Sequence, residues 1–163
     1  MVDPTLRPPA NLVSSRARWY WTVRALVGWL AVAAFEVVIW PGWHRLGDGL
    51  WWVALVTAAL ATAHLTVMPQ WRYRVHRWET SDAAVYTQSG WFNQERRIAP
   101  VARIQTVDTN RGPFEQIFGL SNVTITTASA AGPLKIHGLE RGLADRLADD
   151  LSLRTQSSGG DGT

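Results

Sequence analysis

Two long apolar runs dominate the first half of the chain. They cover residues 25–40 and 50–68, and the turn-rich segment 41–49 joins them. With its tryptophan-rich flank the first run extends back to Trp21, so each run approaches the roughly 20 residues that cross a bilayer. The pattern predicts a transmembrane hairpin over residues 19–68, with helices at about 21–40 and 50–68. Amphipathic tryptophan rings, which settle at headgroup level, gather near the run ends: Trp19, Trp21, Trp40, Trp43, Trp51 and Trp52.

Beyond Pro69 apolar and polar residues alternate over short segments. In residues 71–76 Trp, Tyr and Val alternate with Arg, Arg and His, which is the period-two pattern of a half-buried strand. Clusters of turn-forming residues, including residues 79–82, separate the segments that follow. We expect further strands over residues 83–87, 91–98, 103–109, 122–128 and 134–137.

Two helical patterns occur among and after these strands. Gly112 and Pro113 precede Phe114, Ile117 and Phe118, whose spacing predicts one or two turns of helix. Near the C-terminus leucines recur every fourth residue opposite charged side chains, which predicts an amphipathic helix over residues 139–153 that packs on the sheet. These leucines are Leu139, Leu143, Leu147 and Leu151.

The two ends of the chain lack such periodicity. Residues 1–18 hold three prolines, which predicts a flexible cytoplasmic leader. Residues 154–163 are rich in serine and glycine, which predicts a disordered tail. The sheet domain is therefore expected to span residues 69–153.

Charge predicts the orientation of the hairpin. The net charge is +3, and arginines concentrate before the first run and after the second, whereas the connecting segment holds Arg45 offset by Asp48. The positive-inside rule then places both termini in the cytoplasm, in a multi-pass protein of the plasma membrane. The competing interpretation of the first run is a cleaved signal peptide, which is disfavoured because no small-x-small site stands out after Trp40 and a second run follows.

Two ionisable residues lie within the apolar runs. Ionisable groups inside a membrane are functional candidates, so a proton relay or a transport role of Glu36 is one hypothesis. Glu36 and His64 are expected near opposite surfaces, with no polar residue to bridge them at mid-depth. We therefore favour anchoring at the two surfaces and helix pairing.

The sequence offers no catalytic constellation. It contains no cysteine, and His44, His64, His76 and His137 show no metal-ligand spacing. It has no nucleophile elbow, phosphate-binding loop or dinucleotide fingerprint. We expect no enzymatic activity, no metal and no cofactor, and the scattered charge does not favour nucleic-acid binding.

One basic segment is a candidate binding surface. On the predicted strand Arg72 and Arg74 share a face with His76, and Arg77 is close by. Because this segment leaves the membrane, the three arginines are candidates for contact with anionic headgroups, each worth about 1 kcal/mol near the surface. The alternative is a solvated strand face that reflects only the positive-inside charge bias.

A longer ordered pattern occupies the middle of the chain. It comprises IQTVDT at 104–109, GPFEQIFGL at 112–120 and TITTA at 124–128. Preceded by two apolar runs and followed by one amphipathic helix, it resembles the bacterial pleckstrin-homology (PH) domains of YdbS-like membrane proteins. The residues that carry the resemblance are Ile104, Gln105, Val107, Asp108, Gly112, Pro113, Phe114, Glu115, Phe118, Gly119 and Leu120.

The resemblance implies an α+β membrane protein. Its two-helix transmembrane hairpin would precede a PH-like antiparallel β-barrel or sandwich closed by a C-terminal α-helix. It implies a non-catalytic interaction or assembly module, as a homo-oligomer or in a hetero-oligomer with another bacterial PH-domain membrane protein. The alternative function is sensing of anionic lipid or membrane stress through the juxtamembrane arginines.

The family pattern also has a structural interpretation. We expect Phe114, Ile117, Phe118 and Leu120 to plug one end of the barrel, and the glycines to permit tight reversals. Departures from the family pattern at Gln116 and Ser121 are expected to affect surface contacts only.

Overall fold

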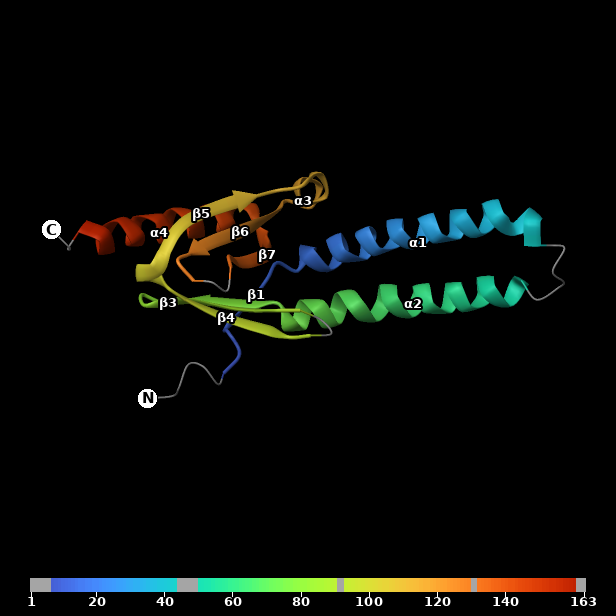
Figure 1. Cartoon of the computed structure of the whole chain (residues 1–163), viewed down its shortest axis with the longest axis horizontal. Coiled ribbons are helices and arrows are strands. Elements are labelled where there is room, and N and C mark those ends of the chain that lie inside the picture. Colours follow the sequence, from blue (N-terminus) through green and yellow to red (C-terminus); the bar gives the residue numbers. More distant parts are fainter. Residues whose placement is uncertain (1–6, 44–49, 91–92, 130–131, 161–163) are drawn as a thin grey trace.

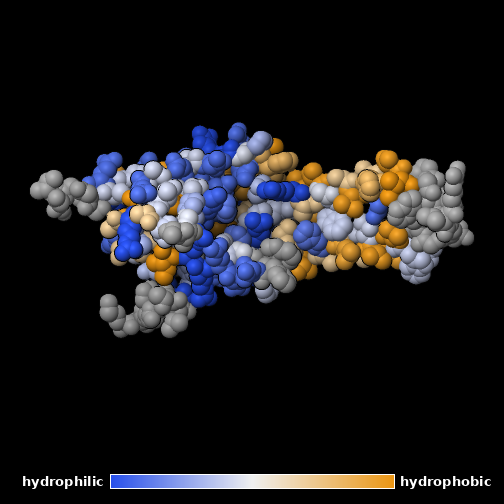
Figure 2. Space-filling model, viewed as in Figure 1, coloured by the Kyte–Doolittle hydropathy of each residue, from blue (hydrophilic) through white to orange (hydrophobic). Residues whose placement is uncertain are grey.

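The structure is a computed structural model that describes residues 7–43, 50–90, 93–129 and 132–160. Two long helices, α1 (Arg16–Trp43) and α2 (Leu50–Val75), lie side by side and project from one end of a sheet domain (Figure 1). Stretches of both, Arg16–Ile39 and Trp51–Val75, are long and apolar enough to cross a membrane. Figure 2 shows hydrophobic side chains over the hairpin and mainly hydrophilic ones over the domain. The two predicted apolar helices are confirmed.

Two hydrogen bonds join the helices inside their apolar stretches. Trp29 Nε1 donates to His64 Nδ1 at 2.9 Å. The hydroxyl of Thr57 donates to Glu36 Oε1 at 2.6 Å. Because polar groups in a bilayer have no water to bond, these contacts stabilise the pairing of the helices. Glu36 and His64 thus face the partner helix, in agreement with the expected helix pairing.

Seven strands of the described chain form two antiparallel sheets. Sheet A has the order β1-β2-β3-β4, and sheet B has the order β5-β6-β7. No strand pairs between the two sheets within the described ranges, so closure into a barrel is not confirmed. The bounds are β1 (Asn11–Leu12), β2 (Arg77–Thr80), β3 (Ala84–Ser89), β4 (Glu95–Pro100), β5 (Ile104–Asn110), β6 (Leu120–Thr127) and β7 (Leu134–Glu140).

Short elements connect and cover the sheets. A 3₁₀ turn, η2 (Val101–Arg103), carries the chain from sheet A to sheet B, and α3 (Pro113–Ile117) joins β5 to β6. The C-terminal helix α4 (Arg141–Gly160) packs on β5, β6 and η2. At the edge of sheet A, Arg97 Nη1 donates to the carbonyl of Pro133 at 3.0 Å, which links β4 to the turn before β7.

The hydrophobic core is shared by both sheets, α4 and the base of α1. The predicted leucine face of the helix is confirmed for Leu143, Leu147 and Leu151, which are buried in or packed against the core. Leu139 is also buried, but it lies on β7, because the helix begins at Arg141 rather than at residue 139. Burying a leucine or isoleucine side chain contributes roughly 1.5–3 kcal/mol. The same core includes side chains of α1, among them Ala17, Tyr20 and Trp21.

The segment after Pro69 is helical, which corrects the predicted strand over residues 71–76. A proline inside a helix costs about 3 kcal/mol or more, and the buried Pro69 is accommodated within α2. Arg72, Val75 and His76 fall at i, i+3 and i+4, so one helical face turns toward the domain, while Trp71 remains exposed. Packing of this face on the domain explains why helix overrides the alternating pattern.

The N-terminal segment is not a flexible leader from residue 7 onward. β1 pairs with β2, with Asn11 opposite Trp78. Glu79, predicted to lie in a turn, belongs to β2, accepts the N–H of Ala10 at 2.9 Å and pairs with Arg7. These contacts fix the segment to sheet A. Residues 1–6 lie outside the described chain.

The predicted disordered tail over residues 154–163 is helical as far as residue 160. α4 continues to Gly160, and only residues 161–163 of that tail lie outside the described part. Arg154 pairs with Asp82 and with Asp150, each at 2.9 Å. These ion pairs hold the added turn of α4 against the β2–β3 turn.

We predict that Gly138→Ala lowers the midpoint of thermal unfolding. Gly138 has φ +75°, and an added Cβ would lie 3.0 Å from Cβ of Ala17 in α1. Strain and overpacking together should cost about 1–3 kcal/mol, measured by tryptophan fluorescence of the full chain in detergent. Gly132→Ala is the matched control, because φ is +78° there but the surrounding space is open. Equal losses in the two variants would contradict the tight contact with α1.

Candidate functional site at the helix–domain joint

Both helices continue past the apolar stretch into the domain. Ala17 is fully buried, Trp21 is 3% exposed and Val75 is 6% exposed. The backbone N–H of Ser14 donates to the carbonyl of Gly138 at 2.9 Å, which fixes the start of α1 against β7. The bases of α1 and α2 thus pack against the two sheets. We call this region of contact the joint.

Trp21 connects the two helices within the joint. Its ring lies 5.1 Å from the ring of His76, measured between centroids. The guanidinium carbon of Arg72 lies 4.7 Å above the same indole, an interaction worth about 0.5–2 kcal/mol. Nε of Arg72 is buried and has no hydrogen-bond partner in the described structure. Arg72 is therefore a packed residue of the joint.

His76 ends α2 and is kept neutral by its surroundings. It is 3% exposed, and its Nδ1 lies 2.8 Å from the carbonyl oxygen of Arg72, which requires a proton on Nδ1. Burial lowers the pKa of His76 to about 4, and the positive charge of Arg72 contributes in the same direction. Burial likewise lowers the pKa of His137 on β7. The joint thus contains two histidines that resist protonation.

A polar chain attaches α3 to the base of α1. The hydroxyl of Tyr20 donates to Glu115 Oε1 at 2.9 Å, and Arg24 Nη1 donates to the Tyr20 oxygen at 3.2 Å. Asn122 Nδ2 also donates to Glu115 Oε1, at 3.4 Å. Burial would raise the pKa of Glu115, but hydrogen bonds from its own backbone, Tyr20 and Asn122, together with Arg24, lower it. Glu115 is therefore an ionised connector between α3 and α1.

The three arginines predicted to contact headgroups do not share one strand face. Arg72 packs on Trp21 in the joint. Arg77 Nη1 donates to the carbonyl of Pro9 at 3.4 Å, and its Nε donates to the carbonyl of Arg74 at 3.3 Å. Only Arg74 of the three has an exposed side chain. The helical course of residues 69–75 accounts for this divergence.

The family-pattern residues surround α3. Leu120 is buried, and Phe118 is half-buried against Tyr20, with ring centroids 6.3 Å apart. In contrast, Phe114 is 41% exposed and Ile117 is 76% exposed. Phe118 and Leu120 therefore pack with the core, whereas the five-residue helix α3 turns Phe114 and Ile117 away from it.

The remaining pattern residues are structural or exposed. Gly112 caps α3, Pro113 occupies its first turn, and Gly119 takes φ +65° where the chain reverses into β6. On β5, Ile104 is buried and Val107 packs against the core. The exposed members are Gln105 and Asp108.

Ser121 differs from its expected surface position. It is fully buried at the start of β6, and its hydroxyl has no hydrogen-bond partner among the described residues. Gln116 is exposed, as expected. A serine inside an alternating strand gives no local signal of which face it occupies until the register is known.

Sequence reasoning missed the joint itself. Tyr20 and Trp21 match the aromatic belt of a membrane interface, and no local pattern separates a ring that packs on a domain from one among headgroups. Their partners His76 and Glu115 are distant in sequence, so only the tertiary fold brings them together. Within the described ranges no group of three histidine or acidic side chains could hold a metal ion.

Comparison with known proteins agrees with this architecture. A family model of the bacterial PH domain matches residues 23–155. The UPF0699 transmembrane protein YdbS of Bacillus subtilis is 32% identical over 156 residues, an alignment covering 88% of this chain and 91% of that protein. No solved structure matches the chain significantly. The protein belongs to the bacterial PH domain family and is a transmembrane protein similar to YdbS.

Proposed function

We propose that this protein is a non-catalytic interaction module whose hairpin holds the PH domain at the cytoplasmic face of the plasma membrane. The partners would be copies of this chain or another PH-domain membrane protein. The observation that supports the proposal is the packing of the helix bases into the domain at the joint. Because Ala17 and Trp21 belong to the domain core, the domain has a fixed height and orientation relative to the helices.

The outer strands of both sheets offer edges for such partners, and β4 and β5 are two of these strands. β4 and β5 each pair with a neighbour on one side only in the described structure. On β4 the side chain of Ile98 is 48% exposed. Unpaired edge strands offer backbone N–H and C=O groups that a strand of another chain can bind. If the domain is held at a fixed distance from the membrane, the same strand edge lies at the same distance in every copy. This favours side-by-side assembly.

The pairing of β1 with β2 supports a common side for both termini. β1 precedes α1 and β2 follows α2, so the two ends of the hairpin have to lie on one side of the membrane to form the pairs Asn11–Trp78 and Leu12–Arg77. Arginine-rich segments flank the hairpin at this same end. By the positive-inside rule that end is cytoplasmic.

The alternative, sensing of anionic lipid or membrane stress through Arg72, Arg74 and Arg77, has narrower support. Arg72 is engaged by Trp21, and Arg77 is engaged by backbone carbonyls. Arg74 has the exposed position that a headgroup contact needs. One exposed arginine contributes about 1 kcal/mol of attraction to an anionic surface, too little for a sensor by itself.

The orientation can be tested with single cysteines, since the chain has none. We predict that a membrane-impermeant maleimide labels Asp48→Cys, between the helices, in intact cells. Asp149→Cys, on the exposed face of α4, should be labelled only after permeabilisation. The reverse labelling pattern would place the domain outside the cell.

Assembly through the β4 edge predicts site-specific cross-linking in native membranes. With Ile98→Cys, a short bis-maleimide should give a product of twice the monomer mass, or a maleimide that carries a photoreactive group should cross-link the chain to a co-purifying PH-domain protein. Arg146→Cys is the matched control, because it is exposed and lies on α4 rather than on β4. Exclusively monomeric Ile98→Cys protein with no co-purifying partner would refute the proposal, and equal cross-linking of both variants would indicate random collision.

The neutral His76 predicts that acid weakens the joint. Its folded pKa of about 4 is below the ordinary 6.5, so between these values the unfolded chain binds more protons and stability falls as pH falls. The loss should reach at most about 3 kcal/mol, seen as a falling midpoint of thermal unfolding. His76→Asn keeps a donor near the Nδ1 position and should flatten the dependence, with a residual slope from His137. An unchanged slope in this variant would assign the acid sensitivity to other groups.

A further inference from the structure

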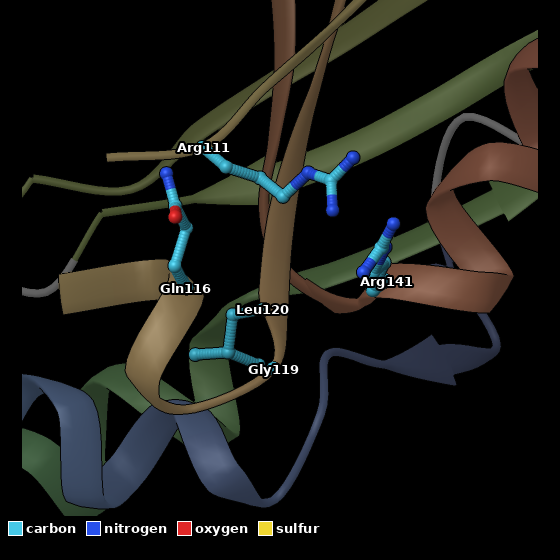
Figure 3. A pocket seen from close by; sticks show the side chains of 5 residues that line it. All are labelled: Arg111, Gln116, Gly119, Leu120 and Arg141. Atoms are coloured by element: carbon cyan, nitrogen blue, oxygen red, sulfur yellow. The ribbon is translucent and has the colours of Figure 1, made fainter. Parts of the chain in front are cut away.

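A polar cavity opens on the domain beside α3. Its volume is about 600 Å³, and Arg111, Gln116, Gly119, Leu120 and Arg141 line it. Arg111 follows β5, Gln116 belongs to α3, and Arg141 begins α4, so separate segments of the chain build the walls. Figure 3 shows the guanidinium groups of Arg111 and Arg141 on the same side of the β6 strand.

The positive charge of this cavity is poorly neutralised. Arg111 forms no ion pair or hydrogen bond with any residue of the described chain. The guanidinium of Arg141 has an acidic neighbour, Asp145, but at 3.9 Å and with both side chains well exposed, so the pair is weak. On α3, Oε1 of Glu115 already accepts hydrogen bonds from Tyr20 and Asn122.

A third guanidinium reaches the edge of the cavity. A Cβ placed on Gly119 would lie 3.1 Å from Nη1 of Arg16, the first residue of α1. Three cations around one opening repel one another unless an anion lies among them. Their planar N–H groups match the oxygens of a phosphate, and the amide of Gln116 adds a neutral donor.

The floor of the cavity leaves room for such a group. Gly119 has no side chain, and its φ of +65° disfavours replacement by larger residues. Leu120 next to it is fully buried, so its side chain contributes to the core rather than filling the opening. Backbone and arginine side chains, not apolar side chains, therefore define the space.

The position of the cavity relates it to the membrane surface. α3 lies at the hairpin end of the domain (Figure 1). Exposed apolar side chains flank the site, namely Ile117 at 76%, Phe114 at 41% and, on α1, Trp19 at 66%. Aromatic and apolar groups beside arginines are typical of surfaces at headgroup level.

We propose that this cavity binds a phosphate-bearing anion between Arg111 and Arg141, with Arg16 at its edge. At this height the group would come from the headgroup of an anionic lipid or from a soluble phosphate ester. The site is separate from the strand edges of the proposed interaction role and from Arg72, Arg74 and Arg77 at or just after the end of α2. Its presence would make the domain responsive to a small ligand as well as to protein partners.

The test uses the purified full chain in micelles of a neutral detergent. Inorganic phosphate and phosphatidylglycerol are titrated separately, with phosphatidylcholine as the zwitterionic reference, and binding is followed by the shift of the thermal unfolding midpoint. Arg111→Gln and Arg141→Gln should each weaken binding about tenfold or more, because each removes a charge-assisted hydrogen-bond donor. Arg74→Gln is the matched control, since it removes one exposed charge at the same end of the protein.

The outcomes separate the sources of the ligand from failure of the proposal. Stabilisation by phosphatidylglycerol alone supports a lipid headgroup, stabilisation by inorganic phosphate alone supports a soluble ester, and stabilisation by both supports recognition of the phosphate itself. No stabilisation of the wild-type chain by either probe overturns the proposal, whatever the variants do. Equal weakening by Arg74→Gln also overturns it, because binding would then follow general charge. None of these results depends on oligomerisation through β4.

Discussion

Burial of the base of α1 in the sheet core is the constraint on which the remaining structure depends. Trp21 and Ala17 are almost or completely inaccessible to solvent, and Gly138 has to lack a side chain for Ala17 to approach. An aromatic side chain buries roughly 150–250 Å², which at about 25 cal/mol per Å² is worth several kcal/mol. Separating the domain from the hairpin would expose this surface together with Val75. The helices and the domain are therefore one folding unit, not two modules on a flexible linker.

The same constraint explains how α3 and its surroundings are positioned. Tyr20 lies one turn above Ala17 on α1 and bonds Glu115, while its ring packs on Phe118. The start of α1 also brings Arg16 to Gly119. Residues that are far apart in the sequence thus converge around α3 only because the base of α1 is held in the domain. The outer edges of β4 and β5 and the basic cavity consequently have a fixed position relative to the two helices.

Some parts of this fold can be predicted from the sequence and others cannot. Apolar length predicts both helices, and the leucines of α4 recur with a helical period that leaves no alternative. The segment 71–76 shows where local pattern fails, because its alternation fits a strand while packing of Arg72 and His76 on Trp21 makes it helical. The joint and the cavity depend on contacts between distant segments. Propensity and periodicity carry no information about such contacts, so Arg111 and Arg141 give no signal before the fold is known.

The short strand β1 has a consequence for the order of events during synthesis. It leaves the ribosome before either long helix, but its partner β2 is made only after both. Sheet A can therefore be completed only in a chain that brings β1 and β2 together after both helices have been made. A chain that fails to do so leaves the outer edge of β2 unpaired, and unpaired edges promote aggregation. The pairing of Asn11 and Leu12 with β2 thus couples completion of the domain to the synthesis of both long helices.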